Sequence, residues 1–280
     1  MGDMADTHPT SPDHRPAPSP AAGDRPDDGG TRDTRPVALV TGGSRGIGRA
    51  VAADLLRDHR VIVGASSRGS ATAAARELAD AAGVAGAGGA AGEEVPEVFA
   101  ADLTDPDAIR AEVDRLVDGG LDRLDVLVHS AGVAPMETVG DATWAQWQHV
   151  FTVNVVAVAE LTRLLLPALR AAGGTVVAVN SGSGYTSGVA QGLYSGSKFA
   201  LRALTDVLRE EERGRVRVSS VHPGKVDTDM QVELQRRKGN RDYDGSVYVR
   251  PESVARAVRL AVETTDEAMI DEVHVRPVVR

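Results

Sequence analysis

Short apolar runs rich in β-branched residues alternate along the chain with longer stretches whose apolar positions recur at helical spacing. The short runs predict buried strands at residues 37–40, 60–65, 97–101, 124–128, 176–179, 215–221 and 272–275. The longer stretches predict helices at residues 49–57, 71–82, 144–172, 198–208 and 251–264, and a further helix after Pro106. Strands that alternate with helices in this way form a parallel, doubly wound sheet, so we expect a three-layer α/β/α fold.

Residues 1–35 differ from the rest, because prolines recur there among Asp, Arg, Gly and Ala, without large apolar residues beyond Met1 and Met4. Such a segment cannot bury enough surface to offset its ordering entropy. We therefore predict a disordered tail, dispensable rather than a docking segment, followed by a single domain at residues 36–280. Within that domain the polar segment 229–250 is expected to form a mobile lid over the cleft.

A glycine-rich turn, residues 41–48, joins the first strand to the first helix. Gly42 would allow the tight turn, Gly46 the close approach of a pyrophosphate, and Gly48 the close packing of helix on strand. Free amides and the helix dipole favour an anion at such a place. Strand, turn and helix together predict a nucleotide site, whose cofactor-binding residues are Gly42, Ser44, Arg45, Gly46, Ile47 and Gly48.

The end of the second predicted strand indicates which nucleotide is preferred. An acidic residue there would select the ribose 2′-hydroxyl of NAD, whereas Arg accommodates the 2′-phosphate of NADP. This chain offers Ser66, Ser67 and Arg68, and Arg45 in the glycine turn adds a second cation. NADP(H) is therefore expected in preference to NAD(H), with Ser66 and Arg68 as contacts; the alternative is that both arginines are solvated surface residues.

Tyr194 and Lys198 are four residues apart, so that their side chains lie one turn apart on the same face of a predicted helix. An ammonium near a phenol favours the phenolate and lowers the pKa of the tyrosine, which suits proton transfer near neutral pH. Ser181, at the end of the preceding strand, could hydrogen-bond the same oxygen. The alternative is an ordinary solvated pair on a helix surface.

Other candidate residues also follow predicted strands. Asp102 could accept a hydrogen bond from the adenine amino group or cap the next helix. His129 begins a small-residue turn, where a packed residue is the simpler interpretation than a base or a metal ligand. Asn154 interrupts an apolar helical stripe and is either a satisfied core amide or part of a polar relay.

Composition excludes several classes of function. A net charge of −9 argues against a nucleic-acid partner or an anionic membrane surface, and the lack of cysteine excludes disulfides and thiolate chemistry. No apolar run approaches the roughly 20 residues of a membrane span, no signal peptide is recognisable, and no metal site is indicated, so the cytoplasm is the expected compartment. The cationic cluster at residues 236–241 either meets an acidic substrate or is a solvated charge run.

From residue 36 to the C-terminus the chain resembles the short-chain dehydrogenase/reductase family in its compact, single-domain form. The matching motifs are T-G-x-x-x-G-I-G at residues 41–48, Asp102, Y-x-x-x-K at residues 194–198, Ser181 thirteen residues before the tyrosine, and P-G-x-V-x-T at residues 223–228. One departure is His129-Ser130-Ala131-Gly132, where the family usually has N-N-A-G. The spacing of Ser183 makes it a lesser candidate for the catalytic serine.

The resemblance implies a Rossmann-like fold and a role for each matching residue. Tyr194 would exchange a proton with the substrate oxygen, Lys198 would lower the pKa of the tyrosine and bind the nicotinamide ribose, Ser181 would polarise the substrate oxygen, and Asn154 would anchor a water. Further cofactor contacts are implied at Asp102, Leu103, His129, Ala131, Gly132, Tyr194, Lys198, Pro223, Gly224, Val226 and Thr228.

The expected function is NADPH-dependent reduction of a ketone or aldehyde to an alcohol, or the reverse reaction. The alternatives are an NAD-dependent alcohol dehydrogenase, a sugar-nucleotide epimerase or dehydratase, and a non-catalytic NADP-binding redox sensor. The resemblance also implies a homodimer or homotetramer, formed by the long helices at residues 144–172 and 194–213. The substrate pocket is expected after Gly132, around residues 185–191 and under the predicted lid.

Overall fold

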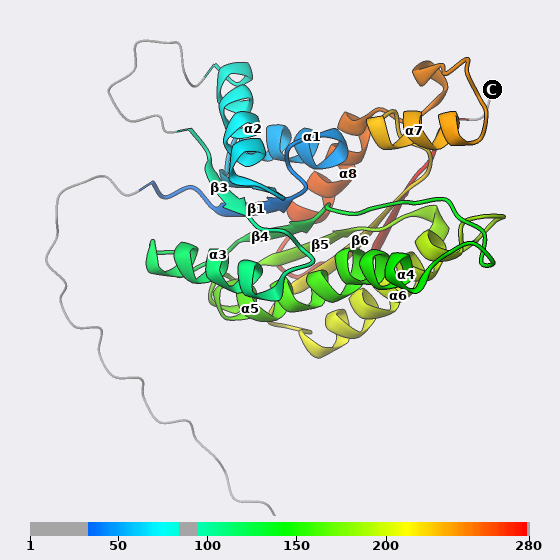
Figure 1. Ribbon diagram of the computed structural model, residues 1–280. Coiled ribbons are helices and arrows are strands. Elements are labelled where there is room, and N and C mark those ends of the chain that lie inside the picture. The colour runs from blue at the N-terminus through cyan, green and yellow to red at the C-terminus, as the bar shows by residue number, and fades with distance from the viewer. Residues whose placement is uncertain (1–32, 84–94, 279–280) are drawn as a thin grey trace, which may run out of the picture. The chain divides into compact units, whose positions relative to one another are not determined.

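The computed structural model describes residues 33–83 and 95–278, which form a three-layer α/β/α fold (Figure 1). Its centre is a seven-stranded sheet in the order β3-β2-β1-β4-β5-β6-β7, in which every neighbouring pair is parallel. The strands are β1 (Val37–Thr41), β2 (Arg60–Ala65), β3 (Glu97–Ala100), β4 (Val126–His129), β5 (Thr175–Val179), β6 (Arg217–Pro223) and β7 (Glu272–Val275). The predicted doubly wound, Rossmann-like α/β fold is confirmed.

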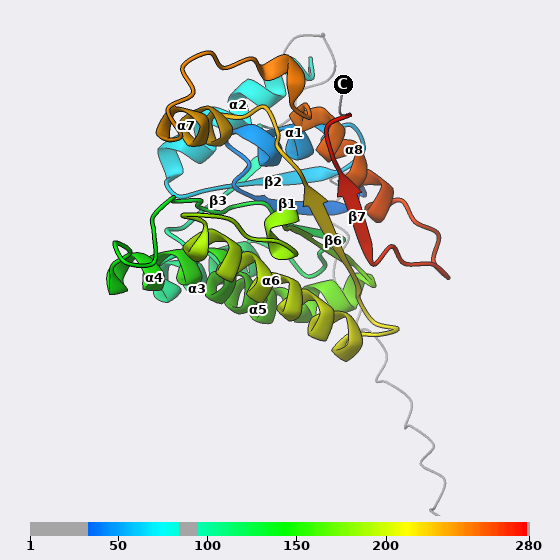
Figure 2. The ribbon, with the colours of Figure 1, turned by 90° about the vertical axis from the view of Figure 1, so that its right-hand side faces the viewer.

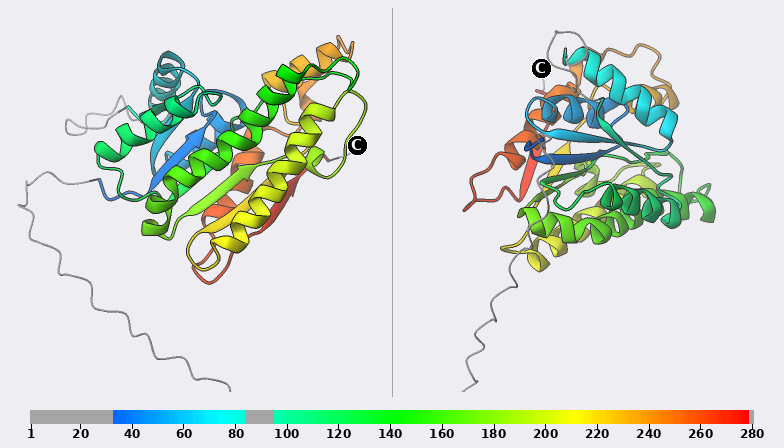
Figure 3. Two further views of the ribbon diagram at one scale, coloured as in Figure 1. Left: turned by 60° about the horizontal axis from the view of Figure 1, so that its bottom comes forward. Right: turned by 90° about the vertical axis from the view of Figure 1, so that its left-hand side faces the viewer.

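Helices cover both faces of this sheet (Figures 1 and 3). One layer consists of α1 (Gly46–Leu55), α2 (Arg68–Ala81) and α8 (Pro251–Val262), and the other of α3 (Pro106–Asp118), α4 (Trp144–Phe151), α5 (Ala157–Ala172) and α6 (Gly192–Glu211). The remaining helix, α7 (Asp229–Arg237), follows β6 and lies within the predicted lid. Only residues 33–35 of the predicted tail are among the described residues, and the tail therefore stays a prediction.

Each face of the sheet has its own apolar core, which explains why the strands read as continuous apolar runs rather than as alternating ones. Val40 and Val63 pack with the α1, α2 and α8 layer, whereas their neighbours Leu39 and Ile62 pack with α3 and α5. Successive side chains of a strand point to opposite faces of the sheet, and here both faces are covered by helices and buried from water. The sheet is thereby held as a rigid platform for the loops at its carboxyl end.

The predicted helix 144–172 is continuous but not uniform, because the π-helical turn η1 (Thr152–Val156) lies between α4 and α5. By length and composition this helix is the one in the described residues that could cross a membrane. The core helix of a globular protein meets the same criteria, and Leu161, Leu165 and Leu169 are indeed buried against the sheet. The helix is therefore explained by the fold.

The boundaries of several elements differ from the predicted ones. Helix α6 begins at Gly192, six residues before the helical pattern at residues 198–208 and two before the long helix expected from Tyr194, so that Tyr194 lies in its first turn. Helix α1 likewise begins inside the glycine turn, at Gly46. The glycines that suggested loops, Gly46 and Gly192, are instead the first residues of helices α1 and α6. Because glycine has no side chain, neighbouring groups can approach the backbone closely at these helix N-termini.

Candidate active site

The loops that follow β1, β4, β5 and β6 lie at the carboxyl edge of the sheet (Figure 2). Two adjoining clefts are formed at this edge. The chain order reverses at the β1/β4 pair, and ligands of open parallel sheets bind at such a point. The smaller cleft has a volume of about 350 Å³ and the larger one about 1250 Å³. Both clefts share five wall residues: Ile47, Ser130, Gly132, Thr228 and Met230.

The glycine turn forms one wall of the smaller cleft, and neighbouring backbone leaves no room for a side chain at Gly42 or Gly48. Gly42 and Gly46 have φ angles of 64° and 55°, which other residues rarely adopt. A Cβ atom on Gly48 would lie 2.2 Å from the carbonyl oxygen of Gly42. In the described structure no side chain caps the N-terminus of α1 and no acid lies in its first turn, so its amides suit an anion. These residues fit a nucleotide pyrophosphate.

Most of the predicted cofactor contacts line one of the two clefts. The smaller cleft is lined by Gly42, Ser44, Arg45, Gly46, Ile47, Gly48, Ser66, Asp102, Leu103, Ala131, Gly132 and Thr228. The larger cleft is lined by Tyr194, Lys198, Pro223, Gly224, Val226 and Thr228. Two predicted contacts, Arg68 and His129, line neither cleft.

The two arginines predicted to bind a 2′-phosphate differ in their surroundings. Arg68 is the first residue of α2, and its guanidinium pairs with Glu112 of α3. Arg45 is exposed at the rim of the smaller cleft, and its side chain makes no ion pair with any described residue. Arg45 is therefore the cation that is free to meet an anion, and Arg68 is not.

Asp102 does not cap the following helix, which was one of the two alternatives. Its Oδ1 accepts hydrogen bonds from the amide and hydroxyl of Thr104, at 2.9 and 2.8 Å, and these bonds lower the pKa of the carboxyl. The cap of α3 is Asp105 instead. The turn that Asp102 closes presents it to the smaller cleft.

His129 is a packing residue rather than a cofactor contact. It ends β4 and is buried, with Nε2 2.8 Å from the hydroxyl of Thr162. The Thr162 hydroxyl donates its own hydrogen to the carbonyl of Val158, so Nε2 must donate to Thr162. Burial lowers the pKa of His129 to about 4, and the imidazole is therefore neutral at pH 7.

Ser181, Tyr194 and Lys198 come together in the larger cleft. Lys198 is buried, its Nζ donates to the carbonyl oxygen of Val179 at 2.9 Å, and it lies 5.9 Å from the centre of the Tyr194 ring. Burial lowers the pKa of Lys198 to about 8. Ser183 lies next to them, and its amide donates to the Ser181 hydroxyl at 3.0 Å.

The pKa of Tyr194 differs from the prediction in direction. Burial raises the pKa of this phenol, and the hydrogen bond with Ser181 opposes the rise only in part. The expected lowering by Lys198 does not dominate, because desolvation penalises the phenolate and the ammonium points to Val179. In this structure Tyr194 is therefore a protonated phenol at neutral pH.

Asn154 lines neither cleft and lies in the π-helical turn η1. Its Oδ1 accepts from the amide of Val133, and its Nδ2 donates to the Val133 carbonyl and to the Ser197 hydroxyl, each at 2.9 Å. Of the two alternatives, these contacts fit a satisfied core amide. The side chain joins the loop after β4 to α6, the helix that carries Tyr194 and Lys198.

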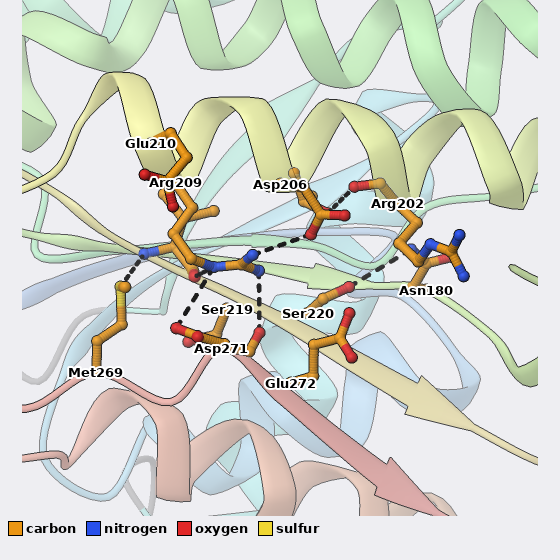
Figure 4. A network of polar contacts seen from close by, with 12 residues as sticks. Asn180, Arg202, Asp206, Arg209, Glu210, Ser219, Ser220, Met269, Asp271 and Glu272 are labelled. Carbon is orange, nitrogen blue, oxygen red and sulfur yellow. Dashed lines mark hydrogen bonds and ion pairs between the residues drawn. The ribbon is translucent and has the colours of Figure 1, made fainter. Parts of the chain in front are cut away.

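A polar network near the C-terminal end of α6 fixes that helix to the edge of the sheet (Figure 4). Arg209 is buried and donates to the carbonyl of Val218 at 2.8 Å, to the Asp206 carboxylate at 2.9 Å and to the carbonyl of Asp271 at 3.0 Å. These bonds connect α6 with β6 and with the residue before β7. The position of Tyr194 and Lys198 thus depends on contacts far from them in sequence.

The larger cleft has the walls that the sequence indicated, and one that it did not. Residues 134–136, residues 185–186 with Gln191, and Met230, Gln231, Leu234 and Lys238 of the predicted lid segment all line it. The missed wall is the C-terminal segment, Arg276, Pro277 and Val278, which follows the edge strand β7. The pairing of β7 with β6 brings this segment to the site, and no local sequence motif predicts that placement.

Comparisons with known proteins agree with this geometry. The family described as "short chain dehydrogenase" matches residues 36–239. A 3-alpha-(or 20-beta)-hydroxysteroid dehydrogenase from Mycobacterium tuberculosis is 35% identical over 199 residues, which cover 69% of this chain and 70% of that protein. A glycine betaine reductase from Emericella nidulans is 30% identical over 249 residues, 86% of this chain, but this chain spans only 18% of that longer protein.

Solved structures give the same result at the level of the fold. The structure of a metagenomic short-chain oxidoreductase in complex with NADP is 32% identical, with a TM-score of 0.70, and the match covers 88% of this chain and 98% of that one. This match covers a larger share of the chain than the family's match to residues 36–239 does. The chain belongs to the short-chain dehydrogenase/reductase family and is an oxidoreductase that acts on hydroxyl or carbonyl groups.

Proposed function

We propose that this protein uses NADPH to reduce a ketone or aldehyde to an alcohol, and catalyses the reverse reaction with NADP⁺. The observation that carries the proposal is the shared wall between the two clefts, which puts Ser181 and Tyr194 beside the glycine turn. The nicotinamide, when bound, supplies or accepts the hydride. The glycine turn would hold the pyrophosphate, and Val226 and Thr228 would hold the nicotinamide.

The residues of the chain supply the proton and its electrostatic setting. Tyr194, kept protonated by burial, would donate its phenolic proton to the carbonyl oxygen of the substrate, and Ser181 would hold that oxygen by a second hydrogen bond. Lys198, with a pKa of about 8, would supply positive charge to the phenolate that is left. Asn154, whose amide is satisfied within the protein, would hold the loop after β4 against α6 rather than take part in the proton transfer.

The preference for NADP rests on Arg45. Its guanidinium is exposed at the smaller cleft, where residues 66–68 carry no carboxylate to select the 2′-hydroxyl of NAD. Arg68 contributes only if it leaves Glu112. The NADP complex of the metagenomic relative supports the same cofactor.

Fluorescence titration with NADPH and NADH tests this proposal. We expect Arg45→Ala to weaken NADPH binding about tenfold or more, as the loss of a charge-assisted hydrogen bond does, and to leave NADH binding unchanged. Arg68→Ala should have a smaller effect. The matched control is Arg76→Ala, an exposed arginine of α2 that lines neither cleft. Equal binding of both nucleotides, indifferent to Arg45, would contradict the NADP assignment and favour NAD-dependent alcohol oxidation.

We also propose that the protein forms a homodimer or homotetramer through the long helices. Apolar side chains are exposed on this layer, among them Trp144 at 77%, Val156 at 57% and Val207 at 53%. Exposed apolar surface is often covered at an interface between subunits. Sedimentation equilibrium of the full chain would give the mass directly, and a monomer at micromolar concentration would contradict the proposal. The cytoplasm stays the expected compartment.

A further inference from the structure

The charged side chains that line the larger cleft are all basic. Its described wall residues include four cations, Lys198, Lys225, Lys238 and Arg276, and no Asp or Glu. The chain as a whole has 40 acidic residues against 31 basic ones, so composition alone would favour acids on this wall. Lys198 belongs to the catalytic group, and the other three cations have no role in the function proposed above.

These three side chains are not neutralised by the rest of the protein. Lys225, Lys238 and Arg276 are exposed, and within residues 33–83 and 95–278 none of them has an ion pair or a side-chain hydrogen bond. Their neighbours in the lid differ, because Arg236 and Arg237 both pair with Glu233 and line neither cleft. Of the three consecutive cations at residues 236–238, only Lys238 therefore presents an unpaired charge to the cleft.

Three separate segments bring these cations to one cleft. Lys225 follows β6, Arg276 follows β7 and Lys238 follows α7. The first two segments are in backbone contact, since the amide of Gly224 donates to the carbonyl of Val275 at 2.7 Å and a Cβ atom on Gly224 would lie 3.6 Å from the Cα atom of Arg276. A solvated charge run comes from one stretch of sequence, whereas this arrangement depends on the fold.

The cofactor does not account for this charge. The pyrophosphate is expected at the glycine turn, and the smaller cleft there is lined by none of the three cations. Uncompensated cations around a cleft attract anionic ligands and select against cationic ones. Pro135, Met136 and Leu234 supply apolar surface in the same cleft.

We propose that the substrate is an anionic carbonyl compound, in which an apolar spacer joins the reacting carbonyl to a carboxylate or similar anion bound by Lys225, Lys238 and Arg276. This inference rests on the proposed function, because it assigns the substrate class of the same site. The hydride and proton transfers are unchanged, and the anion takes no part in them.

Steady-state kinetics with matched ketones test the inference. The probes are methyl-ketone acids of increasing spacer length, beginning with levulinate, each compared with its own neutral methyl ester. With NADPH as reductant we expect the best acid to have a KM about tenfold below that of its ester at similar kcat, and the advantage to shrink as salt rises from about 20 to about 200 mM.

The variants Lys225→Gln, Lys238→Gln and Arg276→Gln should each raise the KM for the acid by about two- to fivefold, as expected for exposed charge pairs, without changing the KM for the ester or the affinity for NADPH. The matched control is Arg237→Gln, which removes the same charge next to Lys238 but outside the cleft. Equal KM values for acid and ester in the wild type, or an equal loss in the control, would overturn the inference.

A second measurement separates failure of this inference from failure of the proposed function. If neither acid nor ester is reduced, the proposed function is wrong, and calorimetric titration of octanoate against octanamide into the full chain still tests the anion site. Tighter binding of octanoate that is weakened by the three cleft variants and kept by Arg237→Gln would support the site. Equal binding of both ligands would overturn it.

Discussion

Gly48 provides the most direct test of the glycine turn, because Gly48→Ala adds a single methyl group at a place where the backbone already fills the space. The new Cβ atom would lie 2.2 Å from the Gly42 carbonyl oxygen and 3.2 Å from the Gly43 nitrogen, so α1 must move away from the turn by about an ångström. Helix α1 cannot move freely, since Val51, Ala52 and Leu55 are buried in the core shared with α8.

The expected cost follows from these contacts. Overpacking of this kind costs about 1–3 kcal/mol, or more where backbone must shift. An alanine in a helix regains at most about 1 kcal/mol over glycine. Because backbone must shift here, the upper end of the cost applies, and we expect Gly48→Ala to be less stable by about 2 kcal/mol, which for a domain of this size lowers Tm by about 4–8 °C. NADPH binding should weaken as well, because the displaced amides are those that face the pyrophosphate.

Thermal unfolding followed by circular dichroism measures the first effect, and fluorescence titration with NADPH the second. The matched control is Gly69→Ala in α2, where nothing lies within 4 Å of the added methyl group, and it should raise Tm slightly. A Gly48→Ala variant with unchanged or higher Tm would refute the packing argument. So would a Gly69→Ala variant that loses as much stability.

Two further predictions concern the acid–base residues. Tyr194→Phe removes the phenolic proton and should lower the rate of carbonyl reduction by about 10²–10⁴-fold, while the affinity for NADPH stays unchanged. The rate is measured as NADPH oxidation, and a turnover within tenfold of the wild type would rule Tyr194 out as the acid. His129 is neutral in the fold with a pKa of about 4, below its unfolded value of 6.5, so the unfolded chain binds a proton first as pH falls and stability is lost between those values. His129→Asn should therefore make the free energy of unfolding in urea less dependent on pH between about 6.5 and about 4, and an unchanged slope would contradict this.

The sequence by itself was enough to predict the secondary structure elements and the fold class, because these depend on patterns within short stretches of the chain. The alternation of apolar runs and helical patterns predicted the α/β sheet, and the four-residue spacing of Tyr194 and Lys198 was enough to put both on one helix face. The glycine turn was also readable, because its conformation is limited by the residues within it. Glycine stands at the positions of this turn that need a positive φ angle, Gly42 and Gly46, and at the crowded position Gly48, so the sequence itself indicates the conformation.

Only the tertiary structure decided which of the candidate charges are free. Arg68 and Arg45 were equivalent as sequence signals, but Glu112 of α3, 44 residues away, pairs with Arg68 alone. His129 was ambiguous until Thr162 and burial made it a neutral packing residue. Likewise the pKa of Tyr194 rises because desolvation outweighs the hydrogen bond with Ser181, and desolvation is a property of the whole fold.

The same reason explains the wall of the larger cleft. Lys225, Lys238 and Arg276 belong to three segments that line one cleft only because β7 pairs with β6 and α7 follows β6 at the carboxyl edge of the sheet. Local sequence fixes the type of charge at each position, but the distance between charges depends on contacts between residues remote in the chain. The burial of a side chain, its ion pairing and its distance from residues of other segments all depend on contacts that are remote in the sequence. These contacts decided which charged residues of this protein are free to bind a ligand.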